Sequence, residues 1–147
     1  MEPIYYMEYQ ESKKSLEEMY DAYYKYSNHK RHGIFKIMDT DLKIKDKTEK
    51  RFEEIRRLSK HDRTVTTAFY DDGFTCATGD IAKEYSYSEV EALFETGQCL
   101  VIIADKRRRR KESFLALKKG ALRGKSLHDL KAFLLKKCPA VSEIKPL

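Results

Sequence analysis

The sequence predicts an α+β fold in which an antiparallel sheet is covered by a C-terminal helix. Short segments rich in β-branched and aromatic residues follow one another over residues 63–117, and turn signals separate them. An amphipathic, capped helical pattern follows over residues 126–137. We expect about five or six strands in the first stretch, with helices in the N-terminal part of the chain.

The first predicted strands form a hairpin. Thr64–Tyr70 is β-branched and aromatic, and Phe74–Thr78 has the composition of a return strand. Asp71-Asp72-Gly73 lies between them, and Asp-Gly is a strong turn signal because glycine tolerates positive φ. Ile81–Tyr87, after the turn at Gly79-Asp80, is a third strand. One face of the first strand carries Val65, Thr67 and Phe69.

The most apolar run follows a short irregular segment. Ser88–Glu91 has the spacing of a capping box and predicts one helical turn, and Ala92–Glu95 is expected to be extended. Cys99–Ala104 is too short for an ordinary helix, and its β-branched content favours a central strand. Asp105–Lys111 is a charged loop, and Ser113–Leu117 closes the sheet.

The C-terminal helix has a complete set of boundary signals. Ser126 is the predicted N-cap, with Asp129 in the first turn, and Pro139 prevents continuation beyond residue 137. Lys136 and Lys137 complement the helix dipole in the last turn. The stripe expected to cover the sheet contains Leu127, Leu130, Phe133 and Leu134.

The N-terminal part predicts one edge strand and two helices. Pro3–Gln10 alternates weakly, and Ser15 with Glu18 opens a helix whose tyrosines either pack on the sheet or form a stacking platform for bases or sugars. The packing interpretation is the stronger one. Lys43–Leu58 predicts a solvent-exposed amphipathic helix, a candidate for partner binding. Its narrow stripe contains Ile44, Thr48, Phe52, Ile55 and Leu58.

Length and composition indicate one domain over residues 1–147, with a mostly helical segment at 1–62 and a sheet-plus-helix module at 63–138. No apolar run approaches the roughly 18 residues of a membrane span, and no secretory signal is visible. The three cysteines are widely spaced, and no two of them form a Cys-x-x-Cys pair. We therefore expect a reduced, cytoplasmic protein, either free or peripheral at the membrane.

The net charge of +6 is unevenly divided along the chain. Residues 1–105 contain 16 Lys/Arg and 21 Asp/Glu, a net charge of −5. Residues 106–137 contain 13 Lys/Arg and 2 Asp/Glu, a net charge of +11, and the last ten residues add none. This asymmetry indicates an anionic partner.

Three segments resemble the YcxB-like family of bacterial proteins: Phe69–Phe74 (FYDDGF), Tyr85–Val90 (YSYSEV) and Leu115–Leu122 (LALKKGAL). The resemblance covers residues 64–138, about half of the chain. It implies a sheet of about six or seven strands, similar to pleckstrin-homology-like domains, closed by a C-terminal helix. Family members carry two hydrophobic helices before this module, whereas residues 34–62 of this chain are highly charged. The resemblance implies no catalytic motif.

The residues give no support for catalysis or for a bound cofactor. His29 and His32 can share a helical face, but no carboxylate ligand accompanies them, and His61 and His128 lie beside polar segments. Asp71 with Asp72 is better explained by the hairpin turn than by acid–base chemistry. We therefore expect a protein that is not an enzyme and that has no metal site.

The outstanding feature is a run of six cations between two predicted strands. Unpaired cations are too costly to bury, so they face either water or an anion. A merely solvated loop that discourages edge-to-edge aggregation is about as plausible as phosphate binding. The candidate anion-binding residues are Lys106, Arg107, Arg108, Arg109, Arg110 and Lys111, with Lys118 and Lys119 at the far end of the next strand.

Together these features predict a non-enzymatic interaction module that contacts anionic partners through a basic hairpin loop. Phospholipid headgroups and acidic proteins are the first class of partner, since each basic residue near an anionic leaflet contributes about 1 kcal/mol. The alternative is a small protein that binds the nucleic-acid phosphate backbone without sequence preference. An enzyme whose site is not visible in the sequence is the third hypothesis.

Overall fold

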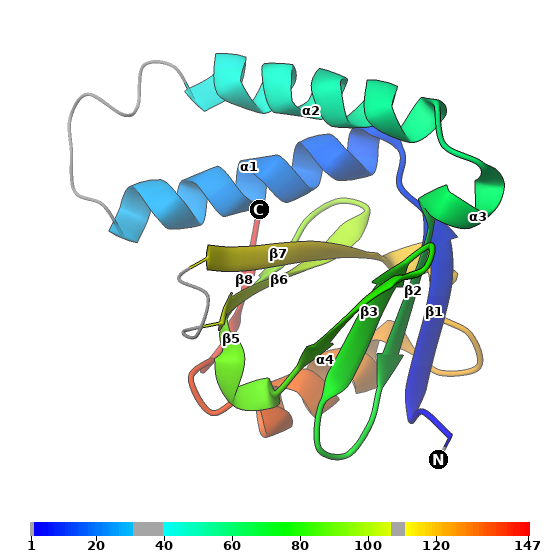
Figure 1. The fold of residues 1–147 in the computed structure, drawn as a ribbon. Coiled ribbons are helices and arrows are strands. Elements are labelled where there is room, and N and C mark those ends of the chain that lie inside the picture. The colour runs from blue at the N-terminus through cyan, green and yellow to red at the C-terminus, as the bar shows by residue number, and fades with distance from the viewer. Residues whose placement is uncertain (1, 31–39, 107–110) are drawn as a thin grey trace.

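The computed structural model describes residues 2–30, 40–106 and 111–147 (Figure 1). His32 and the four arginines at 107–110 lie outside these ranges. The elements in chain order are β1 (Tyr5–Gln10), α1 (Lys13–Lys30), α2 (Thr40–Arg56), α3 (Lys60–Arg63), β2 (Thr64–Phe69), β3 (Phe74–Thr78), β4 (Ile81–Tyr85), β5 (Val90–Glu95), β6 (Cys99–Lys106), β7 (Lys111–Lys118), α4 (Leu127–Lys137) and β8 (Ile144–Pro146).

The α+β class is confirmed, but the strands form two sheets rather than one. Sheet A is antiparallel in the order β1-β2-β3-β4, and sheet B has the order β7-β6-β5-β8. Sheet B is mixed, because β8 pairs in parallel with β5. The described residues contain eight strands, whereas the sequence predicts about six or seven. The additional strand, β8, has three residues and ends in Pro146, so it carries almost no local strand signal.

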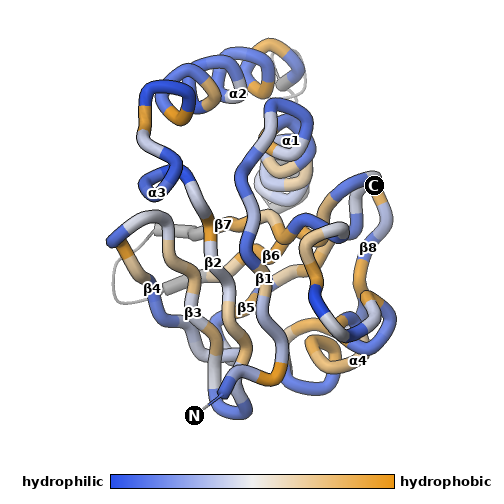
Figure 2. The backbone as a smooth tube through the Cα atoms, turned by 90° about the vertical axis from the view of Figure 1, so that its right-hand side faces the viewer, coloured by the Kyte–Doolittle hydropathy of each residue, from blue (hydrophilic) through white to orange (hydrophobic). Residues whose placement is uncertain are grey.

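Strand β6 is buried on both of its faces. Every side chain from Cys99 to Ala104 is fully buried, and Figure 2 shows the hydrophobic residues concentrated in this part of the structure. Leu100, Ile102 and Ala104 belong to one hydrophobic cluster, whereas the alternate residues belong to another. A strand between two apolar layers needs a continuous apolar run, which is what the sequence provides.

The first core joins the inner faces of both sheets and α4. It includes alternate residues of β1, β2, β6 and β7 together with the helix stripe: Tyr5, Met7, Tyr9, Val65, Phe69, Leu100, Ile102, Leu115, Leu117, Leu130 and Leu134. The second core lies between the other face of sheet B and α1, with Ile55 of α2 at its margin: Leu16, Met19, Ala22, Ile55, Phe94, Cys99, Val101, Ile103 and Ala116.

The predicted hairpin and C-terminal helix are confirmed. In the β2–β3 hairpin Phe69 pairs with Phe74, and the Tyr70 amide donates to the Gly73 carbonyl at 2.8 Å. Gly73 does not have the positive φ on which the turn prediction rests; glycine is needed there because a Cβ would lie 2.5 Å from the Tyr85 carbonyl oxygen. Helix α4 begins after Ser126, whose Oγ accepts from the Asp129 amide at 3.1 Å. The helix therefore starts at the residue that the capping signal predicts.

Two helix starts differ from the prediction. Helix α1 begins at Lys13, because Ser12 and Ser15 cap each other reciprocally, each side chain accepting from the other's amide at 3.1 and 2.8 Å. The capping box near residue 88 lies two residues earlier than predicted, at Ser86 and Glu89. In both places an equally good polar residue stands nearby, so local propensity alone does not select the start.

The interpretation of α2 as a solvent-exposed, partner-binding helix is wrong for most of its apolar stripe. Ile44, Thr48 and Ile55 are buried, since α2 packs along α1 on the outer side of sheet B (Figure 1). The α1 tyrosines also pack inward, as the stronger interpretation predicts: Tyr23 stacks on Phe114 with 4.2 Å between ring centroids. No helix among the described residues is long and apolar enough to cross a bilayer.

We expect Leu100→Ala to lower the free energy of unfolding by about 2–5 kcal/mol, because truncation leaves a cavity in the first core. Urea denaturation followed by circular dichroism measures the loss. Leu42→Ala is the matched control, since Leu42 is 68% exposed and Leu100 is 0% exposed, and it should change stability by less than about 0.5 kcal/mol. Equal effects would contradict the burial of β6.

Candidate functional site

The loop predicted at Asp105–Lys111 is too long, because the strand pairing continues into it: Asp105 and Lys106 belong to β6, and Lys111 begins β7. These are the two longest strands of sheet B. Strands β6 and β7 pair without interruption. The first pair is Cys99 with Lys118, and the last pair is Lys106 with Lys111. In this last pair Lys106 lies opposite Lys111, where the two strands end and the connection between them begins. The side chains of Lys106 and Lys111 are not described, and Arg107–Arg110 lie outside the described residues. The backbone thus places Lys106 and Lys111 side by side at one end of the hairpin.

Lys118 and Lys119 lie at the opposite end of β7. Seven residues separate Lys111 from Lys118, so the two basic groups are roughly 23 Å apart along the strand. Lys119 also has an internal partner: its Nζ lies 2.8 Å from Glu95 Oε2 and donates to the Thr96 carbonyl at 2.6 Å. Among the described residues, Lys118 and Lys119 therefore lie at the far end of β7 from Lys111.

Glu95 forms ion pairs with the lysines at the end of sheet B that carries Lys119. Its second oxygen lies 2.6 Å from Nζ of Lys131 on α4, so one carboxylate joins β5 to two lysines from separate elements. Hydrogen bonds from Lys119 and Lys131 lower the pKa of Glu95, outweighing its partial burial. At neutral pH this carboxylate is charged, and it neutralises part of the local positive field.

A cleft of about 580 Å³ lies between the open edges of the two sheets. Sheet A ends at β4 and sheet B ends at β7, and helices α1, α2 and α3 contribute the remaining walls. Apolar and aromatic side chains dominate the lining: Tyr9, Met19, Tyr20, Leu58, Val65, Ile81, Tyr85, Phe114 and Leu115. At its floor the Tyr9 hydroxyl donates to the Ala116 carbonyl and links the two sheets.

The polar groups in this cleft are suited to binding rather than to nucleophilic attack. Burial raises the pKa of Glu11, although Arg51 and Lys118 act in the opposite direction. Burial also raises the pKa of the Cys76 thiol, outweighing the hydrogen bond from the Thr67 hydroxyl. A protonated thiol is a poor nucleophile. The cleft thus offers the carboxyls of Glu11, Asp62 and Asp80, the cations Arg51 and Lys83, and an apolar floor.

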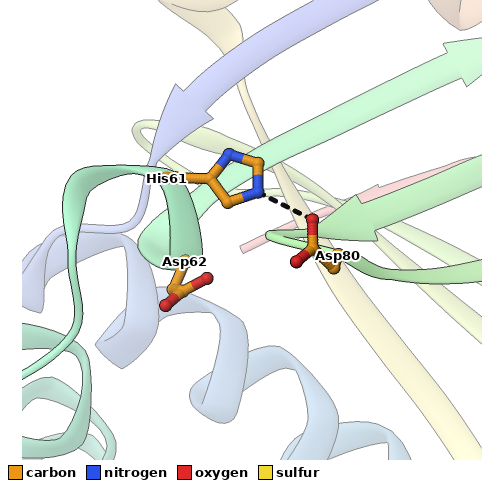
Figure 3. A group of neighbouring side chains, drawn as sticks. All are labelled: His61, Asp62 and Asp80. Atoms are coloured by element: carbon orange, nitrogen blue, oxygen red, sulfur yellow. Dashed lines mark hydrogen bonds and ion pairs between the residues drawn. The ribbon is translucent and has the colours of Figure 1, made fainter.

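His61, Asp62 and Asp80 meet at the rim of this cleft (Figure 3). The Nε2 atom of His61 lies 2.8 Å from Oδ1 of Asp80, and all three side chains are exposed. The hydrogen bond and the charge of Asp80 raise the pKa of His61. Among the described residues this is the one group of three His, Cys, Asp or Glu side chains close enough to share a metal ion.

Sequence reasoning missed this group, although a signal was present. The predicted hairpin pairs Phe69 with Phe74, and the same register extended to its open end places residue 63 opposite residue 80. The Gly79 amide does donate to the Thr64 carbonyl at 3.2 Å. If the β2–β3 register is continued past the ends of the two strands, it predicts that His61 and Asp62 lie near Asp80.

The other sequence candidates remain separate. The side chains of His29 and His32 are not described, and His128 is exposed in the first turn of α4. Asp71 lies 2.7 Å from Lys137, which lowers the pKa of that carboxyl through a hydrogen bond and its charge. Asp71 therefore links the β2–β3 turn to α4.

Comparisons with protein families, with curated proteins and with solved structures found no match to this chain.

We expect Glu95→Gln to lower the free energy of unfolding by about 1 kcal/mol at pH 7. The folded-state pKa of Glu95 is depressed, so its stabilisation is present above the unfolded value of about 4.3 and is lost as pH falls through the folded value. Denaturation at pH 7 and at low pH tests this.

Glu53→Gln is the matched control for Glu95, because Glu53 forms an exposed i,i+3 ion pair with Arg56 at 3.0 Å. Its effect should be below about 0.5 kcal/mol at either pH. An effect of Glu95→Gln that persists undiminished in acid would refute the ion-pair explanation.

Proposed function

We propose that this protein is a non-enzymatic interaction module that binds anionic surfaces through the end of the β6–β7 hairpin. The primary partner is an anionic phospholipid surface. The observation that supports the proposal is the pairing of Lys106 with Lys111 at the last position of the β6–β7 register, since the four arginines lie between these two residues in the sequence. The strand segments behind this end, Val101–Ala104 and Leu115–Leu117, are buried in the two cores, so the hairpin is firmly held.

The distribution of acidic partners supports the choice of this end. Lys119 and Lys131 share Glu95, and Lys137 pairs with Asp71. Three lysines at the other end of sheet B and along α4 therefore have an acidic partner within the protein. The six-residue run contains no acid, and Asp105 and Glu112 are its flanking acids.

The expected strength is sufficient for reversible attachment. Each Lys or Arg near an anionic leaflet contributes about 1 kcal/mol, so six cations give roughly 6 kcal/mol before the cost of ordering side chains. Such binding is screened by salt, with a Debye length of about 8 Å at physiological ionic strength. The protein would associate with an anionic leaflet peripherally and reversibly.

Nucleic acid is the second candidate, because four consecutive arginines also suit phosphate groups. No aromatic residue interrupts Lys106–Lys111, so the hairpin end lacks the stacking surface that single-strand binders use. Duplex binding without base preference is the form that this surface would support.

We further propose that the chain is a relative of the YcxB-like family with a pleckstrin-homology-like module. Helices α1 and α2 follow β1 and precede the β2–β3 hairpin. This is the chain position at which family members carry two hydrophobic helices. Here both helices are rich in charged residues, α1 packs on sheet B and α2 packs along α1, so the pair would serve the fold instead of spanning a bilayer.

Replacing Arg107–Arg110 with glutamine should abolish sedimentation with vesicles that contain phosphatidylserine at about 50 mM salt, where phosphate contacts are strong. The melting temperature should stay nearly unchanged. A parallel titration with duplex DNA distinguishes the two partners: stronger binding to DNA than to vesicles would favour the second candidate.

The matched control removes four positive charges elsewhere, from the exposed residues Lys43, Lys45, Lys47 and Arg57, again by glutamine. This variant has the same net charge but should retain most vesicle binding. Equal losses in the two variants would show that net charge, not the hairpin, determines binding. No binding of the unmodified protein to either partner would refute the proposal.

A further inference from the structure

The cluster at the rim of the cleft joins two segments that are far apart in the sequence. His61 and Asp62 lie on α3, whereas Asp80 lies in the turn between β3 and β4 (Figure 3). One ligand atom from each side chain can be chosen so that all three lie within 4.8 Å of one another. The three donors are one imidazole nitrogen and two carboxylate oxygens.

The backbone around this cluster is held by local interactions. Ser59 caps α3, its Oγ accepting from the Asp62 amide at 3.2 Å, and the Thr64 hydroxyl donates to the Lys60 carbonyl at 2.6 Å. On the other segment Gly79 has φ +60, and a Cβ there would lie 3.0 Å from the Cα of Asp62. Glycine is therefore needed for the turn to approach α3 this closely.

We propose that His61, Asp62 and Asp80 form a binding site for a divalent transition metal ion, with Zn²⁺ as the best fit. Imidazole disfavours Mg²⁺ and Ca²⁺, which prefer oxygen ligands alone, and suits zinc and its neighbours. Three protein ligands leave at least one coordination position for water, as in open zinc sites.

The distances suit this ion after small side-chain rotations. Two ligands about 2.1 Å from a tetrahedral zinc are about 3.4 Å apart. The pair of His61 and Asp80 is closer than this, at 2.8 Å, and no two ligand atoms of the group are more than 4.8 Å apart. Because His61 and Asp80 are largely exposed, their side chains can move to the required spacing without disturbing a packed core.

Binding would connect α3 to the β3–β4 turn at the mouth of the cleft. Asp62 and Asp80 line the cleft, whereas His61 lines a shallower pocket beside Glu8 and Thr66. The ion would thus lie between the cleft and this pocket, and it would link α3 to the β3–β4 turn at the edge that the two share. A ligand that binds only the folded chain also raises its melting temperature.

Calorimetric titration of the metal-free full chain with Zn²⁺ should give one ion per chain and raise the melting temperature by about 5 °C at saturation. His61→Ala and Asp80→Asn should each weaken binding at least about tenfold. All of these residues are exposed, so circular dichroism should show that the variants remain folded. Co²⁺ provides a second measurement, through an absorption spectrum that His61→Ala removes.

His128→Ala is the matched control, because His128 is also an exposed histidine in the first turn of a helix. It should bind Zn²⁺ as the unmodified protein does. The paired variant His29→Ala with His32→Ala tests the other histidine pair in the sequence and should also retain binding. Absence of saturable binding, or binding that survives His61→Ala and disappears in the paired variant, would overturn the proposal.

Discussion

The structure depends on the complete burial of β6 between two apolar layers. Its six residues from Cys99 to Ala104 point alternately into the first and second cores. Each fully buried Val, Leu or Ile contributes about 1.5–3 kcal/mol, so four of them are comparable with the whole net stability of a typical domain. Sheet A with α4 must therefore cover one face, and α1 with α2 must cover the other.

This arrangement explains why the cleft lies where it does. The two sheets meet through the first core and through Tyr9 of β1, but they do not close, because β4 and β7 end their respective sheets. The gap between these edges is filled in part by the helices that cover sheet B. The helices that cover β6 thus also form walls of the cleft. They position α3, which carries His61, at its rim.

The basic residues are divided by the same framework. Strand β7 separates the run at 106–111 from Lys118 and Lys119, and the position of α4 brings Lys131 to Glu95. The sequence shows the cluster of charge but not this division. Whether a lysine has an internal acidic partner depends on residues tens of positions away, here Glu95 for both Lys119 and Lys131.

The sequence by itself determined the features that depend on neighbouring residues: the Asp-Gly turn, the Ser126 cap of α4, the apolar run of β6 and the α+β class. These follow from backbone preferences and burial patterns within a few positions. Only the tertiary structure decided the division into two sheets, the strand β8, the buried face of α2 and the ion pairs of Glu95 with Lys119 and Lys131. Each of these requires contacts between segments that lie far apart in the sequence, and residue patterns within a few positions do not specify such contacts.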